Sequence, residues 1–171
     1  MELQYSTRDL ARAAVIAAAY AALAWISNFF GLAFPAIQFR LSEALCVLPC
    51  RDRKAAIPGL AVGCLITNLL SPYGVLDIVV GSAATLLAAL LTARCQKKWL
   101  APLPPVIANT VLIGLVLAYE QAGTSAAFWP TYAFNALAVG LGEAVACYGL
   151  GGLLLWRLDK SNALQHYLQN R

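Results

Sequence analysis

Charged side chains are scarce in this chain of 171 residues. Asp, Glu, Lys and Arg make up only 12% of it, whereas 61% of the residues are hydrophobic and the mean hydropathy is +0.70. A soluble domain carries about 25% charged residues, so the composition excludes an ordinary soluble domain. The length allows one domain over residues 1–171, ending in a polar tail over residues 157–171.

Groups that carry out catalysis are also missing. The one histidine, His166, lies in the polar tail, and no Gly-x-x-x-x-Gly-Lys-Ser/Thr phosphate loop occurs. The five cysteines show no metal-type clustering, and most lie in apolar runs, where a free cysteine acts as a small hydrophobe. No basic stretch alternates with aromatics as in a single-strand binder. We therefore expect no enzyme activity, disulfide, metal, cofactor or nucleic-acid partner.

The positive charges that are present follow a pattern. Eleven of the twelve Lys and Arg residues fall within residues 8–12, 51–54, 94–98 and 157–171, and only Arg40 lies elsewhere. Cytoplasmic loops of membrane proteins carry an excess of Lys and Arg. The pattern predicts cytoplasmic N- and C-termini and an even number of crossings. Ala19-Tyr20-Ala21 resembles a signal-peptide cleavage site, but the apolar run continues through Phe30, so we expect a retained first helix.

Six transmembrane helices satisfy this pattern. Only helices and closed barrels can span lipid, and these runs are too long and continuously apolar for barrel strands, so we expect an all-α integral membrane protein. The second and third spans are shorter than the roughly 20 residues that a crossing needs. Short spans interrupted by Gly or Pro point to a substrate site in transporters; simple tilting or bilayer thinning is the alternative. The expected spans are residues 9–29, 39–50, 55–70, 75–93, 103–119 and 131–156.

Several polar residues lie within or near these apolar spans. Ionised groups are costly in lipid, so they usually face a cavity or a partner. Glu143 lies twelve residues past Thr131, about 18 Å along a helix, and Arg40 is placed to pair with Glu43 at i,i+3. We expect a cavity open to the outside, with Glu143 as its floor and Tyr148 beyond it; the alternative is a purely structural set of ion pairs and caps. The other expected lining residues are Arg40, Glu43, Asn68, Asp77 and Asn135.

The first span suggests a surface for another helix. Alanines recur at four-residue spacing in two adjacent stripes, and small residues at this spacing let helices approach closely in lipid. The alternative is packing inside this bundle. The stripes are Ala14, Ala18 and Ala22, and Ala13, Ala17 and Ala21.

Ordered motifs along the chain resemble the QueT family. The resemblance covers about residues 6–157, and no single motif decides it. Its motifs include Thr7-Arg8-Asp9-Leu10-Ala11, Gln38-Phe39-Arg40-Leu41-Ser42-Glu43-Ala44-Leu45, Ile57-Pro58-Gly59, Leu76-Asp77-Ile78-Val79-Val80-Gly81-Ser82, Leu103-Pro104-Pro105-Val106 and Val139-Gly140-Leu141-Gly142-Glu143.

The resemblance implies a function and a location. QueT proteins are substrate-binding S components of energy-coupling-factor (ECF) transporters in the bacterial plasma membrane, assigned to queuosine precursors. Such a component binds its ligand from outside and docks on a transmembrane T protein and two ATPases. It is expected to topple and release the ligand inside. The implied ligands are the 7-deazaguanines queuine, preQ1 and preQ0, whose N1–H and exocyclic amine suit a carboxylate.

A flat deazaguanine ring would stack on an aromatic side chain. The candidates are Phe39, Tyr73, Trp129, Tyr132 and the deeper Tyr148, although any of them equally fits the interfacial aromatic belt. Two rival functions stay open. One is a standalone secondary carrier or channel for a small polar solute, and the other is an accessory subunit that binds no ligand.

Overall fold

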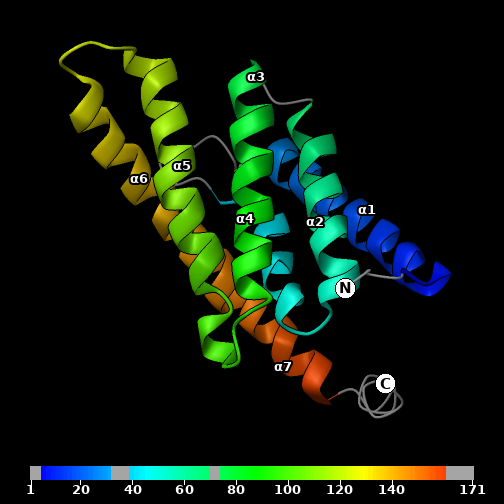
Figure 1. Cartoon of the computed structure of the whole chain (residues 1–171). Helices are drawn as coiled ribbons and strands as arrows, with labels where there is room; N and C mark the ends of the chain where they lie inside the picture. The colour runs from blue at the N-terminus through cyan, green and yellow to red at the C-terminus, as the bar shows by residue number, and fades with distance from the viewer. Residues whose placement is uncertain (1–4, 32–38, 70–73, 161–171) are drawn as a thin grey trace.

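The computed structural model describes residues 5–31, 39–69 and 74–160, and all regular structure within these ranges is helical (Figure 1). Two of the long rods contain π-helical turns: α3, η2 and α4 form one rod, and α6, η4 and α7 form another. The elements are α1 (Thr7–Phe29), the 3₁₀ helix η1 (Leu41–Cys50), α2 (Arg53–Asn68), α3 (Gly74–Leu76), the π-helical η2 (Asp77–Gly81), α4 (Ser82–Thr92), the 3₁₀ turn η3 (Lys98–Leu100), α5 (Leu103–Ala122), α6 (Phe128–Ala144), the π-helical η4 (Val145–Gly151) and α7 (Gly152–Lys160).

Four helical rods are long and apolar enough to cross a membrane: Thr7–Phe29, Gly74–Thr92, Lys98–Ala122 and Phe128–Lys160. The other two elements are short. A 3₁₀ helix rises about 2.0 Å per residue and an α-helix about 1.5 Å, so η1 spans about 20 Å and α2 about 24 Å. Both lengths are below the roughly 30 Å of the hydrocarbon core. The all-helical prediction is confirmed for the described residues, whereas six crossings and the side of each terminus stay predictions.

Local sequence explains where the first helices begin. Ser6 Oγ accepts a hydrogen bond from the Asp9 amide and Asp9 Oδ2 accepts one from the Ser6 amide, which forms a capping box at the start of α1. Asp52 caps α2 with a single hydrogen bond, which its carboxylate accepts from the Ala55 amide at 3.3 Å. Both caps satisfy amide groups that have no partner inside their helix.

Small residues bring α1 and α2 into close contact. A Cβ added to Gly59 would lie 2.7 Å from the Ala13 carbonyl oxygen, and one added to Gly63 would lie 2.9 Å from that of Ala17. Backbones this close require glycine on one helix and small side chains on the other. Ala13, Ala17 and Ala21 are accordingly buried inside the molecule, and Ala14, Ala18 and Ala22 are exposed.

The short helix η1 lies at the centre of the bundle rather than at its edge. In Figure 1, α5 and α6 lie on one side, α1 and α2 on the other, and α4 between them, with the cyan η1 behind α4. η1 contacts α1, α2, α4 and η4, and Val47 in it is fully buried. A Cβ on Gly151 of η4 would lie 3.0 Å from the Ala44 carbonyl oxygen. The apolar run expected as a second span therefore packs at the core of the bundle, and its crossing of the membrane stays a prediction.

The described residues of the four basic clusters meet at one end of the bundle. Arg12 forms ion pairs with Asp9 at 2.5 Å and with Asp52 at 2.6 Å, which joins the first cluster to the second. Asp159 of α7 pairs with both Arg51 and Lys98, which joins the second, third and fourth clusters. This gathering at one end is what the predicted topology requires. Three residues named from the sequence, Gln38, Tyr73 and His166, lie outside the described ranges.

Candidate ligand-binding site

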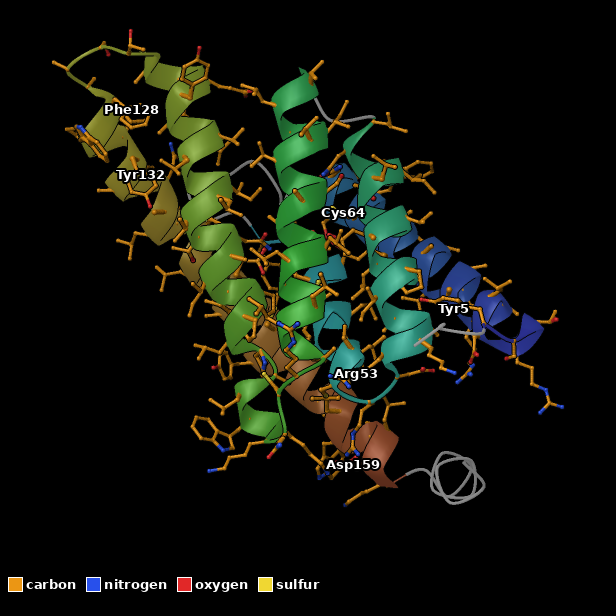
Figure 2. All side chains as sticks on the ribbon, viewed as in Figure 1. Tyr5, Arg53, Cys64, Phe128, Tyr132 and Asp159 are labelled. Atoms are coloured by element: carbon orange, nitrogen blue, oxygen red, sulfur yellow. The ribbon has the colours of Figure 1, made fainter. Side chains whose placement is uncertain are left out.

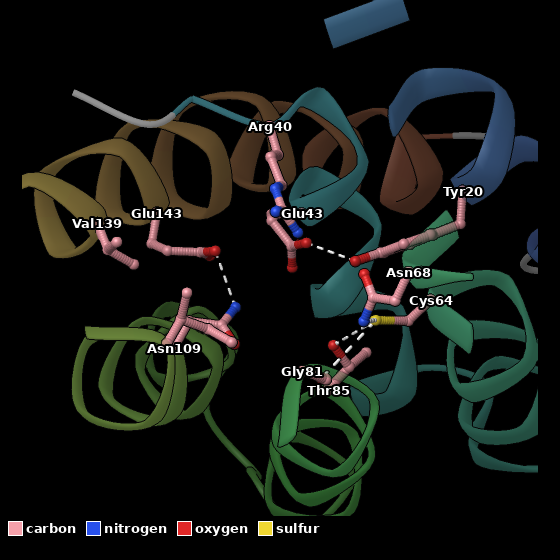
Figure 3. A pocket seen from close by; sticks show the side chains of 11 residues that line it. Tyr20, Arg40, Glu43, Cys64, Asn68, Gly81, Thr85, Asn109, Val139 and Glu143 are labelled. Carbon is pink, nitrogen blue, oxygen red and sulfur yellow. Dashed lines mark hydrogen bonds between the residues drawn. The ribbon is translucent and has the colours of Figure 1, made fainter. Parts of the chain in front are cut away.

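A cavity lies where α1, η1, α2, α4, α5 and α6 face one another (Figure 3). It encloses about 370 Å³ of empty space, a figure that includes space open to solvent. Its lining residues are Tyr20, Arg40, Glu43, Cys64, Asn68, Gly81, Thr85, Asn109, Ile113, Val139 and Glu143.

Glu43 of η1 is one of two buried carboxylates in this lining, with 2% of its surface exposed. Tyr20 of α1 donates a hydrogen bond of 2.5 Å to its Oε1. The Cys46 thiol lies 3.1 Å from Oε2. Donors from two elements therefore hold the carboxylate in place, as a buried charge requires.

Glu143 of α6 is the second buried carboxylate. Asn109 of α5 donates a hydrogen bond of 2.8 Å from Nδ2 to Glu143 Oε1, and Figure 3 shows this pair on the side of the cavity opposite Tyr20. The Cys147 thiol lies 3.6 Å from Glu143 Oε2 and 3.3 Å from the backbone oxygen of Glu43. Cys147 thus contacts both segments that carry the buried carboxylates.

A polar wall connects α2 with the π-helical turn η2. Asn68 donates from Nδ2 to the Asp77 backbone oxygen at 3.2 Å and to Cys64 Sγ at 3.4 Å. Thr85 also donates to Cys64 Sγ, at 3.2 Å. A Cβ on Gly81 would lie only 2.7 Å from Asn68 Nδ2. The glycine therefore makes room for the amide, and π-helical turns often occur at such functional positions.

Arg40 brings positive charge to the cavity. Figure 3 shows its side chain extending toward Glu43, yet the structure contains no ion pair of 4.0 Å or less between Arg40 and any acid in the described ranges. The expected i,i+3 pairing with Glu43 is not observed, because Arg40 precedes η1 in an extended conformation (φ −111°, ψ 117°) rather than occupying a helical turn.

The other residues expected in the cavity lie elsewhere. Asp77 is buried behind Gly81, and its Oδ2 has no hydrogen-bond partner within the described residues. Asn135 Nδ2 donates a hydrogen bond of 3.1 Å to Gln121 Oε1. Trp129 is 70% exposed and Tyr148 is 44% exposed. Trp129 forms an edge contact with Tyr132 near the start of α6. None of these side chains lines the cavity, so their roles as ligand contacts stay predictions.

Several lining residues were not among the expected site residues. Tyr20 lies three residues after Ala17 on the buried face of α1. In the sequence, a tyrosine in an alanine-rich stretch was the feature that could have indicated this site residue. Asn109 faces Glu143 from α5, and this pairing across 34 positions depends on the fold. The remaining unexpected residues are Cys64, Gly81, Thr85, Ile113 and Val139.

This arrangement favours a small ligand with several hydrogen-bond donors. Carboxylates accept hydrogen bonds most strongly when the geometry is paired or charge-assisted, and two of them face one cavity here. Ile113 and Val139 add apolar surface that suits a flat ring. Within the ranges that the structure describes, no group of three or more His, Cys, Asp or Glu side chains is placed to hold a metal ion.

Comparisons with known proteins place these features in context. The sequence model of a family described as QueT transporter matches residues 10–160. A protein named queuosine precursor transporter QueT, from Lactococcus lactis subsp. cremoris, is 33% identical over 97 residues, covering 54% of this chain and 56% of that protein. The chain thus matches little more than half the length of that relative. No solved structure matched this chain.

Proposed function

The chain belongs to the QueT transporter family of multi-pass bacterial plasma-membrane proteins, and from that premise we propose that it is the substrate-binding S component of an ECF transporter for a queuosine precursor. The resemblance of its sequence motifs and the printed name of its relative both favour this cargo. The observation that carries the proposal is the cavity in which Glu43 and Glu143 face each other, each held by donors from other helices.

A 7-deazaguanine matches the donors and acceptors of this cavity. Its ring presents a carbonyl oxygen, N1–H and an exocyclic amine side by side. Asn109 Nδ2 and the Glu143 carboxylate lie next to each other at 2.8 Å, so a donor and an acceptor face the same edge of the ligand. Glu143 would accept from N1–H and the amine together, and the second hydrogen of the Asn109 amide would reach the carbonyl.

The second carboxylate suits the substituent of the larger precursors. PreQ1 and queuine carry a basic aminomethyl nitrogen at the ring. Glu43 lies across the cavity from Glu143 and would accept a hydrogen bond from this cation. Asn68 and Arg40 complete the polar lining around it. PreQ0, which carries a nitrile, would lack this contact, so we propose tighter binding of the aminomethyl precursors.

Energy for uptake would come from partner subunits. The chain contains no phosphate-binding loop, so ATP hydrolysis falls to the two ATPases of such a transporter. The exposed stripe Ala14, Ala18 and Ala22 on α1 offers a shallow surface for the T protein. The neighbouring stripe at Ala13, Ala17 and Ala21 packs against α2 and is not available.

Binding and uptake measurements test this proposal separately. Isothermal calorimetry on the purified chain would compare queuine, preQ1, preQ0 and guanine. We expect saturable binding of the deazaguanines and uptake into vesicles only with the T protein and ATPases present. Uptake by the chain alone would favour a standalone carrier instead. Absence of any binding by a folded chain would make the cavity a structural feature and refute the proposal.

A further inference from the structure

A second hollow lies at the end of the bundle where the basic clusters meet. It is lined by the residue before the α1 cap, the first turns of α2, the last turn of α4 and the two residues after α4. It contains about 600 Å³ of empty space, including space open to solvent. None of its lining residues contributes to the ligand cavity. These residues are Tyr5, Arg53, Lys54, Ile57, Leu90, Ala93 and Arg94, of which Figure 2 labels Tyr5 and Arg53.

The described charged residues that line this groove are all positive. Arg53, Lys54 and Arg94 contribute three cations, and no acid lines it among the residues that the structure describes. Arg53 and Arg94 are exposed, and neither forms an ion pair with any residue in the described ranges. Two guanidinium groups with this exposure present planar, fixed donors that match a phosphate. The Tyr5 hydroxyl adds a neutral donor at the same groove.

The groove is also apolar along one side. Ile57 of α2, Leu90 of α4 and Ala93, which directly follows α4, line it beside the cations. Leu90 is 43% exposed and belongs to a rod that is long and apolar enough to cross the membrane. The occupant that fits therefore has an anionic head for the arginines and a hydrocarbon part that lies along Ile57 and Leu90.

We propose that this groove binds one anionic phospholipid of the leaflet that faces the basic end of the bundle. The phosphate would lie between Arg53 and Arg94, and an acyl chain would follow Leu90 toward the membrane centre. Basic hollows between transmembrane helices at the cytoplasmic boundary bind anionic headgroups by this chemistry. A bound lipid would hold the start of α2 against the end of α4. This role is independent of which ligand fills the central cavity.

Lipid retention by the full chain tests the proposal. The purified chain would be incubated in detergent with phosphatidylglycerol or with phosphatidylcholine of the same acyl chains, and retained lipid counted by mass spectrometry of the intact protein. A basic residue near an anionic surface contributes enough to change affinity about fivefold. We expect Arg53→Ala and Arg94→Ala each to weaken phosphatidylglycerol retention by about that factor, with little effect on phosphatidylcholine.

Matched variants separate the groove from general surface charge. Lys97→Ala removes an equal charge from the same end of the bundle but outside the groove, and it should retain phosphatidylglycerol normally. Leu90→Ala should weaken retention, whereas Leu87→Ala, which alters an equally exposed leucine of α4 outside the groove, should not. All these residues are partly or fully exposed, so the variants should fold, and a melting curve checks this.

Three results would overturn the proposal. One is equal retention of the two lipids by the unaltered chain. A second is displacement of phosphatidylglycerol by soluble glycerol phosphate at equal affinity, because the apolar side would then contribute nothing. A third is unchanged lipid retention in Arg53→Ala and Arg94→Ala with weaker co-purification of partner subunits, which would make the groove a protein-docking surface.

Discussion

Glu143→Gln tests the proposed contact with the guanine-like edge most sharply. The change removes the charge of a carboxylate that is 7% exposed while keeping its size and shape. Asn109 Nδ2 can still donate to the remaining carbonyl oxygen, as it does to Oε1 at 2.8 Å. The new amide group then presents a donor to the N1–H and amine donors of the ligand. One charge-assisted acceptor is lost, and two donors face each other.

The expected loss follows from the value of such contacts. A hydrogen bond to a charged group contributes roughly 1.5–3 kcal/mol, and about 1.4 kcal/mol corresponds to a tenfold change in affinity. Glu143→Gln should therefore weaken binding of preQ1 by roughly 10-fold to 150-fold in calorimetry. Its melting temperature should not fall, because neutralising a buried carboxylate removes a desolvation penalty.

Glu120→Gln is the matched control. It makes the same chemical change at an exposed position near the end of α5, outside the cavity lining. We expect its affinity to equal that of the unaltered chain. Equal affinity in Glu143→Gln and Glu120→Gln, with both proteins folded, would refute the assignment of Glu143 to the ligand.

Three further changes test other parts of the structure. Ala18→Trp should leave ligand affinity intact and abolish partner-driven uptake. Ala17→Trp, at a position that is 6% exposed, should instead lower the melting temperature. Uptake that survives Ala18→Trp would show that the partner docks on another surface. Gly81→Ala would place a Cβ 2.7 Å from the Asn68 amide nitrogen in the cavity wall, so we expect a loss of about 1–3 kcal/mol in stability and weaker ligand binding. The Cβ of Gly149→Ala meets nothing within 4 Å, so this control should bind the ligand with unchanged affinity in calorimetry. Asp159→Asn should reduce the free energy of unfolding by about 1 kcal/mol or less, because its two ion pairs are partly exposed; a loss that persists at high salt would contradict an electrostatic cause.

The helical path could be predicted because its signals are local. Gly and Pro interrupt the apolar runs, and caps such as Ser6 and Asp52 start the helices, so the expected spans agree with the observed ones to within a few residues at most ends. The match over residues 10–160 confirms the family noted from the sequence motifs. The form of η1 could not be predicted, since its 3₁₀ geometry and central position depend on the helices packed around it.

The cavity was only partly predictable for a related reason. Arg40, Glu43, Asn68 and Glu143, which the sequence named, line it, because a polar residue in an apolar segment needs a polar neighbour wherever the segment packs. Their contact with a ligand stays a prediction. Hydropathy alone does not predict which face of a helix a given side chain occupies. The π-helical turn η4 shifts the register just after Glu143, and Tyr148 there is 44% exposed.

The small-residue face of α1 shows the same limit. Two alanine stripes are equivalent in sequence, and only the position of α2 buries one of them. Tyr20 continues the buried face into the cavity, where it holds Glu43 at 2.5 Å. Its role depends on a contact between residues 23 positions apart, which no local pattern encodes.

Calorimetric titration of the purified chain with preQ1, against guanine at the same concentrations, tests the central claim most directly. The two-carboxylate cavity predicts saturable binding of one preQ1 per chain and weaker binding of guanine, which lacks the aminomethyl cation. No heat of binding from a folded chain, or equal affinity for the two compounds, would contradict the claim that Glu43 and Glu143 together recognise a queuosine precursor.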